Sequence, residues 1–131
     1  MKILLIFSIF VAAFLNLNCF SQNSSDNTKT INAEEFNKIA KSGYITILDV
    51  RTPQEYAEGH IKDAVNIDFY DPNFKNSLAK LDKNKTYLVY CRSGNRSVKA
   101  SKILNDLEVH SIYNLKGGIE DWKSSKYSLE Y

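Results

Sequence analysis

The sequence predicts an α/β domain in which a mainly parallel sheet lies between helices. Segments 44–50 (YITILDV) and 86–90 (TYLVY) are almost continuous runs of apolar, β-branched and aromatic residues. Such runs are typical of strands that are covered on both faces, as in parallel sheets. Between and after these runs, apolar residues recur with helical spacing, and the resulting alternation of strands and helices is typical of α/β domains.

The first expected helix follows Asn32, a residue type that favours the N-cap, and Glu35 lies at its third position. Gly43 is expected to end this helix. Its apolar face has the i, i+3, i+4 spacing of an amphipathic helix and consists of Phe36, Ile39 and Ala40. The strand at 44–50 comes next.

The middle and last parts of the chain continue the alternation. Segment 64–68 (AVNID) predicts a short strand, and segment 71–73 (DPN) predicts a turn. Segment 111–115 (SIYNL) predicts the last strand, and 117–125 (GGIEDWKSS) a closing turn and helix. Two further helices are expected from apolar faces with helical spacing: Phe74, Leu78 and Leu81, then Ala100, Ile103, Leu104 and Leu107.

The start of the chain is typical of an export signal. Residues 1–21 hold one charged residue, Lys2, then an apolar stretch from Ile3 to Leu15 and a short polar exit that ends in Ser21. The apolar stretch is shorter than the roughly 20 residues that a transmembrane helix needs. We therefore expect a signal peptide and an exported, periplasmic protein without a transmembrane span. Cys19 leaves a lipid-anchored form open as an alternative.

Segment 22–29 (QNSSDNTK) has no apolar residue and predicts a flexible tether, so the domain is expected to cover residues 30–131. Loss of residues 1–21 removes Lys2 and no acid, so the 17 basic residues of the whole chain become 16 against 15 acidic ones. This balance gives no reason to expect a nucleic-acid partner. The remaining length suits one domain with its own core, which we expect to be a monomer.

Cys91 is the single cysteine expected in the mature chain. One thiol cannot form an internal disulfide, so an exported protein keeps it for pairing with another chain or for its reactivity. Cys91 directly follows the strand at 86–90, and ligands of open α/β sheets bind at the carboxyl ends of strands. A free cysteine after an apolar strand can also be an inert core residue, but two arginines and a glycine are poor core neighbours.

The residues after Cys91 are expected to favour its thiolate. Gly94 lets the backbone turn so that N–H groups point inward, and a helix is expected to begin near Arg96 or Ser97. Arg92 and Arg96 add positive charge on either side. Burial would raise the pKa of the thiol, but a loop at the mouth of the sheet is expected to stay partly hydrated. The sequence thus predicts a lowered pKa for Cys91.

Three segments resemble, in order, the signatures of the rhodanese family. Segment 91–97 (CRSGNRS) is similar to its active-site loop, a cysteine, four residues and an arginine before a helix. Segment 48–67 (LDVRTPQEYAEGHIKDAVNI) is similar to its Asp-Val-Arg, Glu-Tyr, Gly-His-Ile and Ala-x-Asn-Ile signature, and segment 115–122 (LKGGIEDW) resembles its closing Leu-x-Gly-Gly-x-x-x-Trp. The resemblance implies a three-layer rhodanese-like domain with helices on both faces of the sheet.

The resemblance also implies a sulfurtransferase without a metal or organic cofactor. The Cys91 thiolate would take the outer sulfur of a donor such as thiosulfate and pass it, from a persulfide, to a thiophilic acceptor, either a small molecule or a protein thiol. The substrate-binding residues would be Arg92, Ser93, Gly94, Asn95 and Arg96.

Two other functions stay open. One is a non-catalytic sulfur-carrier or anion-binding module of the same family. The other is a phosphatase or arsenate reductase, but relatives with that chemistry have five residues between the cysteine and the arginine. Here four residues separate Cys91 from Arg96, which suits a single sulfur.

Asp49 and Arg51 end the first strong strand, so they are expected at the same sheet edge as Cys91, in supporting roles. We expect Arg51 to pair with Glu55 and Asp49 to fasten the loop after Cys91 through backbone N–H groups. His60 is expected to make a structural hydrogen bond. Two separated histidines and one mature cysteine do not suggest a zinc site. Gly117 and Gly118 are expected in a tight turn, and Trp122 in the core.

Overall fold

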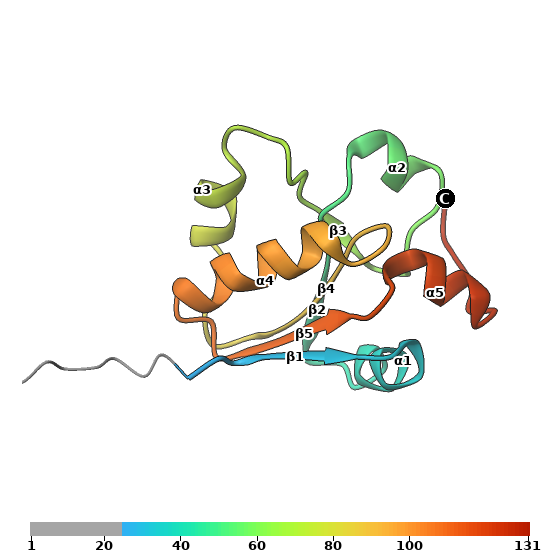
Figure 1. Cartoon of the computed structure of the whole chain (residues 1–131), viewed down its shortest axis with the longest axis horizontal. Helices are drawn as coiled ribbons and strands as arrows, with labels where there is room; N and C mark the ends of the chain where they lie inside the picture. Colours follow the sequence, from blue (N-terminus) through green and yellow to red (C-terminus); the bar gives the residue numbers. More distant parts are fainter. Residues whose placement is uncertain (1–24) are drawn as a thin grey trace, which may run out of the picture.

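The computed structural model describes residues 25–131, which form a five-stranded sheet with helices on both faces (Figure 1). The strand order is β1-β5-β4-β2-β3, and all neighbouring strands are parallel. The strands are β1 (Thr28–Ile31), β2 (Ile45–Asp49), β3 (Val65–Asn66), β4 (Thr86–Tyr90) and β5 (Ser111–Leu115). The predicted α/β class with a mainly parallel sheet is therefore confirmed. The predicted signal peptide and Cys19 lie outside the described residues.

Five helices among the described residues complete the fold and give it three layers. Figure 1 shows α3 and α4 on one side of the sheet and α1 on the other, with α5 beyond the carboxyl end of β5. The helices are α1 (Ala33–Ala40), α2 (Pro53–Ala57), α3 (Phe74–Ala79), α4 (Asn95–Asp106) and α5 (Gly118–Ser124). Between residues 25 and 131, no helix is both long and apolar enough to cross a membrane.

The sheet separates two hydrophobic cores, and β4 contributes to both. Leu88 and Tyr90 pack in the core that contains Phe36 of α1 and Trp122 of α5. Tyr87 and Val89 of β4 belong to the core beneath α3 and α4, and Cys91, directly after the strand, belongs to the same core. Successive residues of a strand point to opposite faces, so the position of Cys91 on the α3/α4 face follows from its place after Tyr90. Both faces of β4 are buried, which explains its uninterrupted apolar sequence.

The fold begins earlier than the sequence predicts. Thr28 and Lys29, assigned to the tether, belong to β1, where they pair with Ile112 and Tyr113 of β5. The sequence of β1 is polar because it is an edge strand with one neighbour, and its first three residues are at least partly exposed. Edge strands often carry charged and polar side chains that discourage pairing with other chains. Hydrophobic periodicity therefore could not separate this strand from a linker.

Candidate active site

Cys91 lies at the carboxyl edge of the sheet, directly after β4 and before α4. It begins the segment Cys91–Arg96, here called the Cys91 loop. The cysteine side chain is buried, with 1% of its surface exposed, so the expected partial hydration of the thiol is wrong. The loop returns on itself at Gly94, whose φ of 110° lies in the left-handed region that favours glycine. α4 starts at the next residue, Asn95.

The sulfur atom of Cys91 is surrounded by neutral hydrogen-bond donors. The Gly94 N–H donates to Cys91 Sγ at 3.1 Å, and Ser97 Oγ lies 3.4 Å from Sγ. Ser97 is fully buried, and its Oγ also contacts the Gly94 carbonyl at 3.1 Å. A rotating hydroxyl can turn its hydrogen toward the sulfur when the thiolate forms. Ser97 was not among the predicted site residues, although its place after Arg96 on the first turn of α4 was a usable signal.

These donors lower the pKa of Cys91. Burial alone would raise the pKa, because it penalises the charged thiolate. The Ser97 hydroxyl and the backbone N–H groups of Ser97, Gly94 and Ser93 together more than offset that effect. The predicted direction of the shift is therefore confirmed. The expected inward backbone N–H groups are therefore among the causes, whereas the thiol is not hydrated and the two arginines are not among the main causes that lower its pKa.

Arg92 is directed toward the surface and not toward the sulfur. Its Nε donates to Oε1 of Glu120 on α5 at 3.1 Å, and the two side chains are 69% and 55% exposed. Glu120 also uses its backbone N–H, which donates to the Arg92 carbonyl at 3.2 Å. The position of Arg92 at the rim leaves it accessible to a solute, but its charge is shared with a carboxylate.

Arg96 forms a bidentate ion pair with Glu55. The predicted pair of Glu55 with Arg51 is therefore wrong. Nη1 and Nη2 of Arg96 each donate to one Glu55 carboxylate oxygen at 2.8 Å, and the guanidinium also lies 5.5 Å from the ring centre of Tyr70. Hydrogen bonding to Arg96 is the largest cause that lowers the pKa of Glu55 to about 2. The pair joins the Cys91 loop to α2.

Glu55 is also fixed within its own helix. It forms a capping box with Thr52, in which Thr52 Oγ1 accepts from the Glu55 N–H and Glu55 Oε2 accepts from the Thr52 N–H at 2.8 Å. The spacing Thr-Pro-Gln-Glu at 52–55 carries this signature in the sequence and could have identified both the start of α2 and the direction of Glu55.

Asp49 and Arg51 form a buried network on the opposite face of the sheet edge. Arg51 Nη2 donates to Asp49 Oδ2 at 2.6 Å and to the Gly59 carbonyl at 2.8 Å. The Tyr90 hydroxyl donates to Asp49 Oδ2 at 2.6 Å and accepts from the Ile61 N–H at 3.1 Å. Asp49 also accepts the Arg51 backbone N–H at 2.9 Å, but its carboxylate accepts no hydrogen bond from the Cys91 loop, so the expected contact with that loop is wrong. These bonds tie β2 and β4 to segment 59–61.

The two glycines at the start of α5 hold the Cys91 loop in place. The N–H groups of Ile119 and Glu120 donate to the carbonyls of Cys91 and Arg92 at 2.9 and 3.2 Å. Gly118 has a φ of 60°, and a Cβ atom there would lie 2.5 Å from both carbonyl oxygens. Gly117 also has a positive φ, 72°. The predicted tight turn is confirmed, and its contact with the loop explains why only glycine fits at Gly118.

The remaining candidates are structural. His60 is 9% exposed, its Nδ1 lies 3.0 Å from the Tyr56 carbonyl, and its ring stacks on that of Tyr56. Trp122 is buried, and its Nε1 donates to the Ser128 carbonyl at 3.0 Å. Among residues 25–131 no group of three or more His, Cys, Asp or Glu side chains could hold a metal ion.

Comparison with known proteins places this geometry in a family. The model of the rhodanese-like domain matches residues 32–125. The chain is 35% identical to the thiosulfate sulfurtransferase PspE of Escherichia coli (strain K12), over 56% of this chain and 70% of that protein. It is also 35% identical to a tRNA uridine(34) hydroxylase of Pelagibacter ubique (strain HTCC1062), over 80% of this chain and 35% of that protein. A crystal structure of a rhodanese-related protein from Thermoplasma volcanium superposes with a TM-score of 0.70 at 32% identity, covering 78% and 97% of the two chains.

Proposed function

This chain belongs to the rhodanese-like domain family, and we propose that it is a sulfurtransferase in which Cys91 carries the sulfur as a persulfide. The observation that carries the proposal is the buried Cys91 sulfur, which accepts the Gly94 N–H and has a lowered pKa. A lowered pKa supplies thiolate, the nucleophilic form of cysteine. The same inward donors suit a persulfide, which is also anionic.

The proposed reaction has two displacement steps. The Cys91 thiolate attacks the outer sulfur of thiosulfate, a new S–S bond forms, and sulfite leaves with the electron pair of the broken bond. A thiophilic acceptor such as a thiolate then attacks the outer sulfur of the persulfide. The bond from that sulfur to Cys91 Sγ breaks, and its electron pair restores the Cys91 thiolate. Electrons balance within each exchange, so the scheme uses no external oxidant or reductant.

The ion pair of Arg96 supports sulfur over phosphate chemistry. A tetrahedral oxyanion is best held by a guanidinium whose donors are free to bind it. Both terminal nitrogens of Arg96 instead donate to Glu55, and a short loop of four residues separates Arg96 from Cys91. A phosphatase or arsenate reductase is for this reason the weaker candidate.

A sulfur-carrier module is the second candidate, and the burial of Cys91 is the observation that favours it. Only 1% of the surface of Cys91 is exposed, so a sulfur donor or acceptor reaches the thiol only if the surrounding loop moves. A carrier would load sulfur once and release it to a particular partner, whereas an enzyme would turn over with free thiosulfate.

We further propose export to the periplasm, on the sequence of residues 1–21 alone, with lipid anchoring through Cys19 as the alternative.

The test is intact-mass spectrometry of the protein after thiosulfate and before any acceptor. We expect the wild type to gain the mass of one sulfur atom and to lose it when a thiol acceptor is added. The Cys91→Ser variant should fold, gain no sulfur and show no transfer, because the change removes the nucleophile and little volume. Turnover without any sulfur adduct would contradict the persulfide. An adduct without turnover would favour the carrier.

A further inference from the structure

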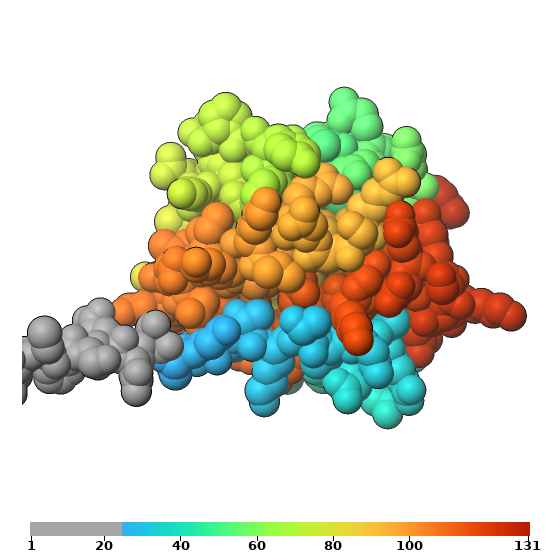
Figure 2. Space-filling view, viewed as in Figure 1, coloured from blue at the N-terminus to red at the C-terminus, as the bar shows by residue number. Residues whose placement is uncertain are grey.

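A pocket opens between β1 and α4, and the proposed sulfur transfer does not use it. Its volume is about 440 Å³, which lies within the range of about 300–1,000 Å³ found for small-molecule sites. In Figure 2 the blue surface of β1 and the orange surface of α4 adjoin along one side of the molecule, away from the green surface of α2. The residues that line the pocket lie outside the Cys91 loop. The lining residues are Asp26, Thr28, Thr30, Val98, Lys102, Asn105, Asp106 and Asn114.

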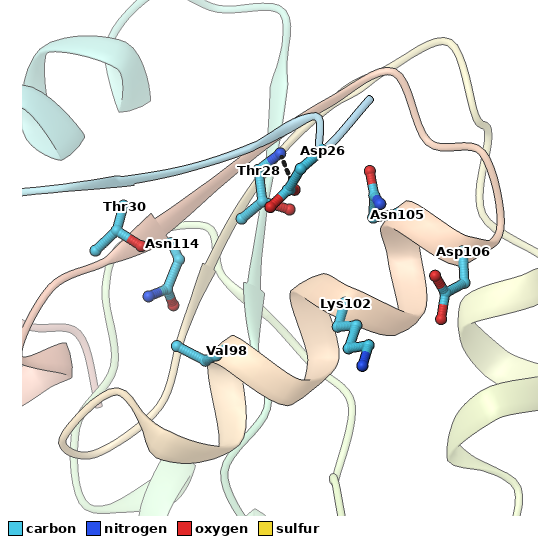
Figure 3. Close-up of a pocket in the computed structure, with 8 residues that line it drawn as sticks. All are labelled: Asp26, Thr28, Thr30, Val98, Lys102, Asn105, Asp106 and Asn114. Carbon is cyan, nitrogen blue, oxygen red and sulfur yellow. Dashed lines mark hydrogen bonds between the residues drawn. The ribbon is translucent and has the colours of Figure 1, made fainter. Parts of the chain in front are cut away.

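The inner wall of this pocket holds buried polar atoms that have no hydrogen-bond partner. Asn114, on β5, is only 1% exposed, and its Oδ1 accepts no hydrogen bond from residues 25–131. The hydroxyl of Thr28 on β1 is in the same condition. Figure 3 shows the Asn114 side chain extending from the sheet toward α4, where Val98 lies across from it. A buried polar group without a partner costs about 1–3 kcal/mol, so two in one pocket indicate a site that is completed by a ligand.

The pocket is held open by neighbouring polar groups that do have partners. At one end, Asn105 of α4 accepts the Asn27 N–H at 2.9 Å, and the Asn27 side chain donates to the Val109 carbonyl at 3.2 Å. Asp26 accepts the Thr28 N–H at 2.9 Å. These bonds fix the separation of β1 from α4 while they leave the Thr28 hydroxyl and the Asn114 amide unpaired.

The chemistry of the pocket selects a neutral ligand with an amide group. The carboxamide of Asn114 presents a donor and an acceptor side by side, whichever way it is turned, and another carboxamide is its planar complement. The charged lining residues are two acids, Asp26 and Asp106, and one base, Lys102, so the site does not favour anions such as thiosulfate. We propose that the β1/α4 pocket binds a small neutral molecule that carries a carboxamide, paired with Asn114 and flanked by the Thr28 hydroxyl.

The binding test is an NMR titration of the full chain labelled with nitrogen-15, with L-glutamine as the probe. L-glutamate is the control that replaces the carboxamide with a carboxylate and adds one negative charge, and glucose is a neutral control without a carboxamide. We expect saturable shifts with glutamine at backbone amides of β1 and α4, and none with glutamate or glucose. The absence of saturable shifts with glutamine would overturn the proposal. Equal shifts with glutamate or glucose would overturn the carboxamide specificity.

Two variants separate a binding role of Asn114 from a structural one. Asn114→Leu removes an amide that has no partner in the free protein, so the melting temperature should stay equal or rise, and sulfur transfer should be unchanged. Glutamine affinity should fall at least about tenfold, the loss expected for a hydrogen bond of average strength. Val98→Trp, at a position 53% exposed, should narrow the pocket and weaken glutamine binding while Asn114 is retained. Full glutamine affinity in either folded variant would contradict the assignment.

Discussion

The two faces of the sheet edge stabilise charge in different ways, although the adjacent residues Tyr90 and Cys91 contribute to them. On the α1/α5 face, the Tyr90 hydroxyl joins the Asp49–Arg51 ion pair, in which both charges are buried and hydrogen-bonded. On the α3/α4 face, Cys91 receives only neutral donors, of which the Gly94 N–H at 3.1 Å and the Ser97 hydroxyl at 3.4 Å contact the sulfur directly. The buried Asp49–Arg51 ion pair stabilises the fold. The Cys91 thiolate, held by neutral donors, keeps an electron pair that can attack a substrate.

The two arginines of the Cys91 loop are each paired with a carboxylate, as Arg51 is with Asp49 on the other face. Arg92 pairs with Glu120, and Arg96 pairs with Glu55. The Glu55 hydrogen bond is the largest cause of the raised pKa of Arg96, and the charge of Cys91 contributes less. The loop donors therefore stabilise the thiolate, and the arginine pairs hold the geometry of the loop. The following substitutions test that division, from the largest expected effect to the smallest.

Asp49→Asn should cause the largest loss of stability. The change leaves the buried Arg51 guanidinium without its counter-charge, which costs about 3–5 kcal/mol in comparable buried pairs. Urea unfolding would measure the loss. Glu34→Gln is the matched control, because Glu34 pairs with Lys38 at 3.3 Å but both side chains are about 70% exposed, and such pairs contribute little. Similar losses in the two variants would contradict the structural role of the Asp49 network.

Gly118→Ala should impair both stability and sulfur transfer. The new Cβ would lie 2.5 Å from the carbonyl oxygens of Cys91 and Arg92, so α5 or the loop must move, at a cost of about 2–4 kcal/mol. Gly43→Ala is the control, since Gly43 has a positive φ of 90° but no atom within 4 Å of an added Cβ. It should lose about 1–2 kcal/mol through backbone strain and keep full transfer activity. Unchanged activity in Gly118→Ala would separate α5 from the site.

Glu55→Gln should make stability less dependent on acid pH. The folded-state pKa of Glu55 is lowered to about 2, so its stabilising effect is present above the unfolded pKa of about 4.3 and is lost as the pH falls toward 2. The wild type should therefore lose about 1 kcal/mol more than the variant over that interval, after allowance for solvent around the pair. Thermal unfolding at a series of pH values would measure this. Parallel curves would show that the ion pair adds nothing.

The sequence predicted the fold well where burial is complete and poorly where it is partial. β2 and β4 are buried on both faces, so their apolar runs identified them, and the glycines with positive φ were identified at the tight turn before α5. β1 and β3 lie at the two edges of the sheet. The polar sequence of β1 resembled a linker, and β3 is limited to Val65–Asn66 where a strand over 64–68 was expected.

The sequence predicted the position of Cys91 in the site but not the partners of the nearby arginines. The carboxyl-edge rule located Cys91, and the loop sequence predicted the direction of its pKa shift. The partners of Arg51, Arg92 and Arg96 depend on side-chain directions across different elements, which spacing along the chain does not determine. Glu55 illustrates this, because a nearby basic residue, Arg51, competes in the sequence with the true partner 41 positions away.

The most direct test of the account is the pH dependence of Cys91 alkylation by iodoacetamide in the wild type, Ser97→Ala and Arg92→Ala. The wild-type midpoint should lie below the free-cysteine value of about 8.5. Ser97→Ala should raise the midpoint, because it removes a donor to the sulfur, and Arg92→Ala should leave it in place. A wild-type midpoint at or above about 8.5, or a larger shift in Arg92→Ala than in Ser97→Ala, would contradict stabilisation of the thiolate by neutral donors.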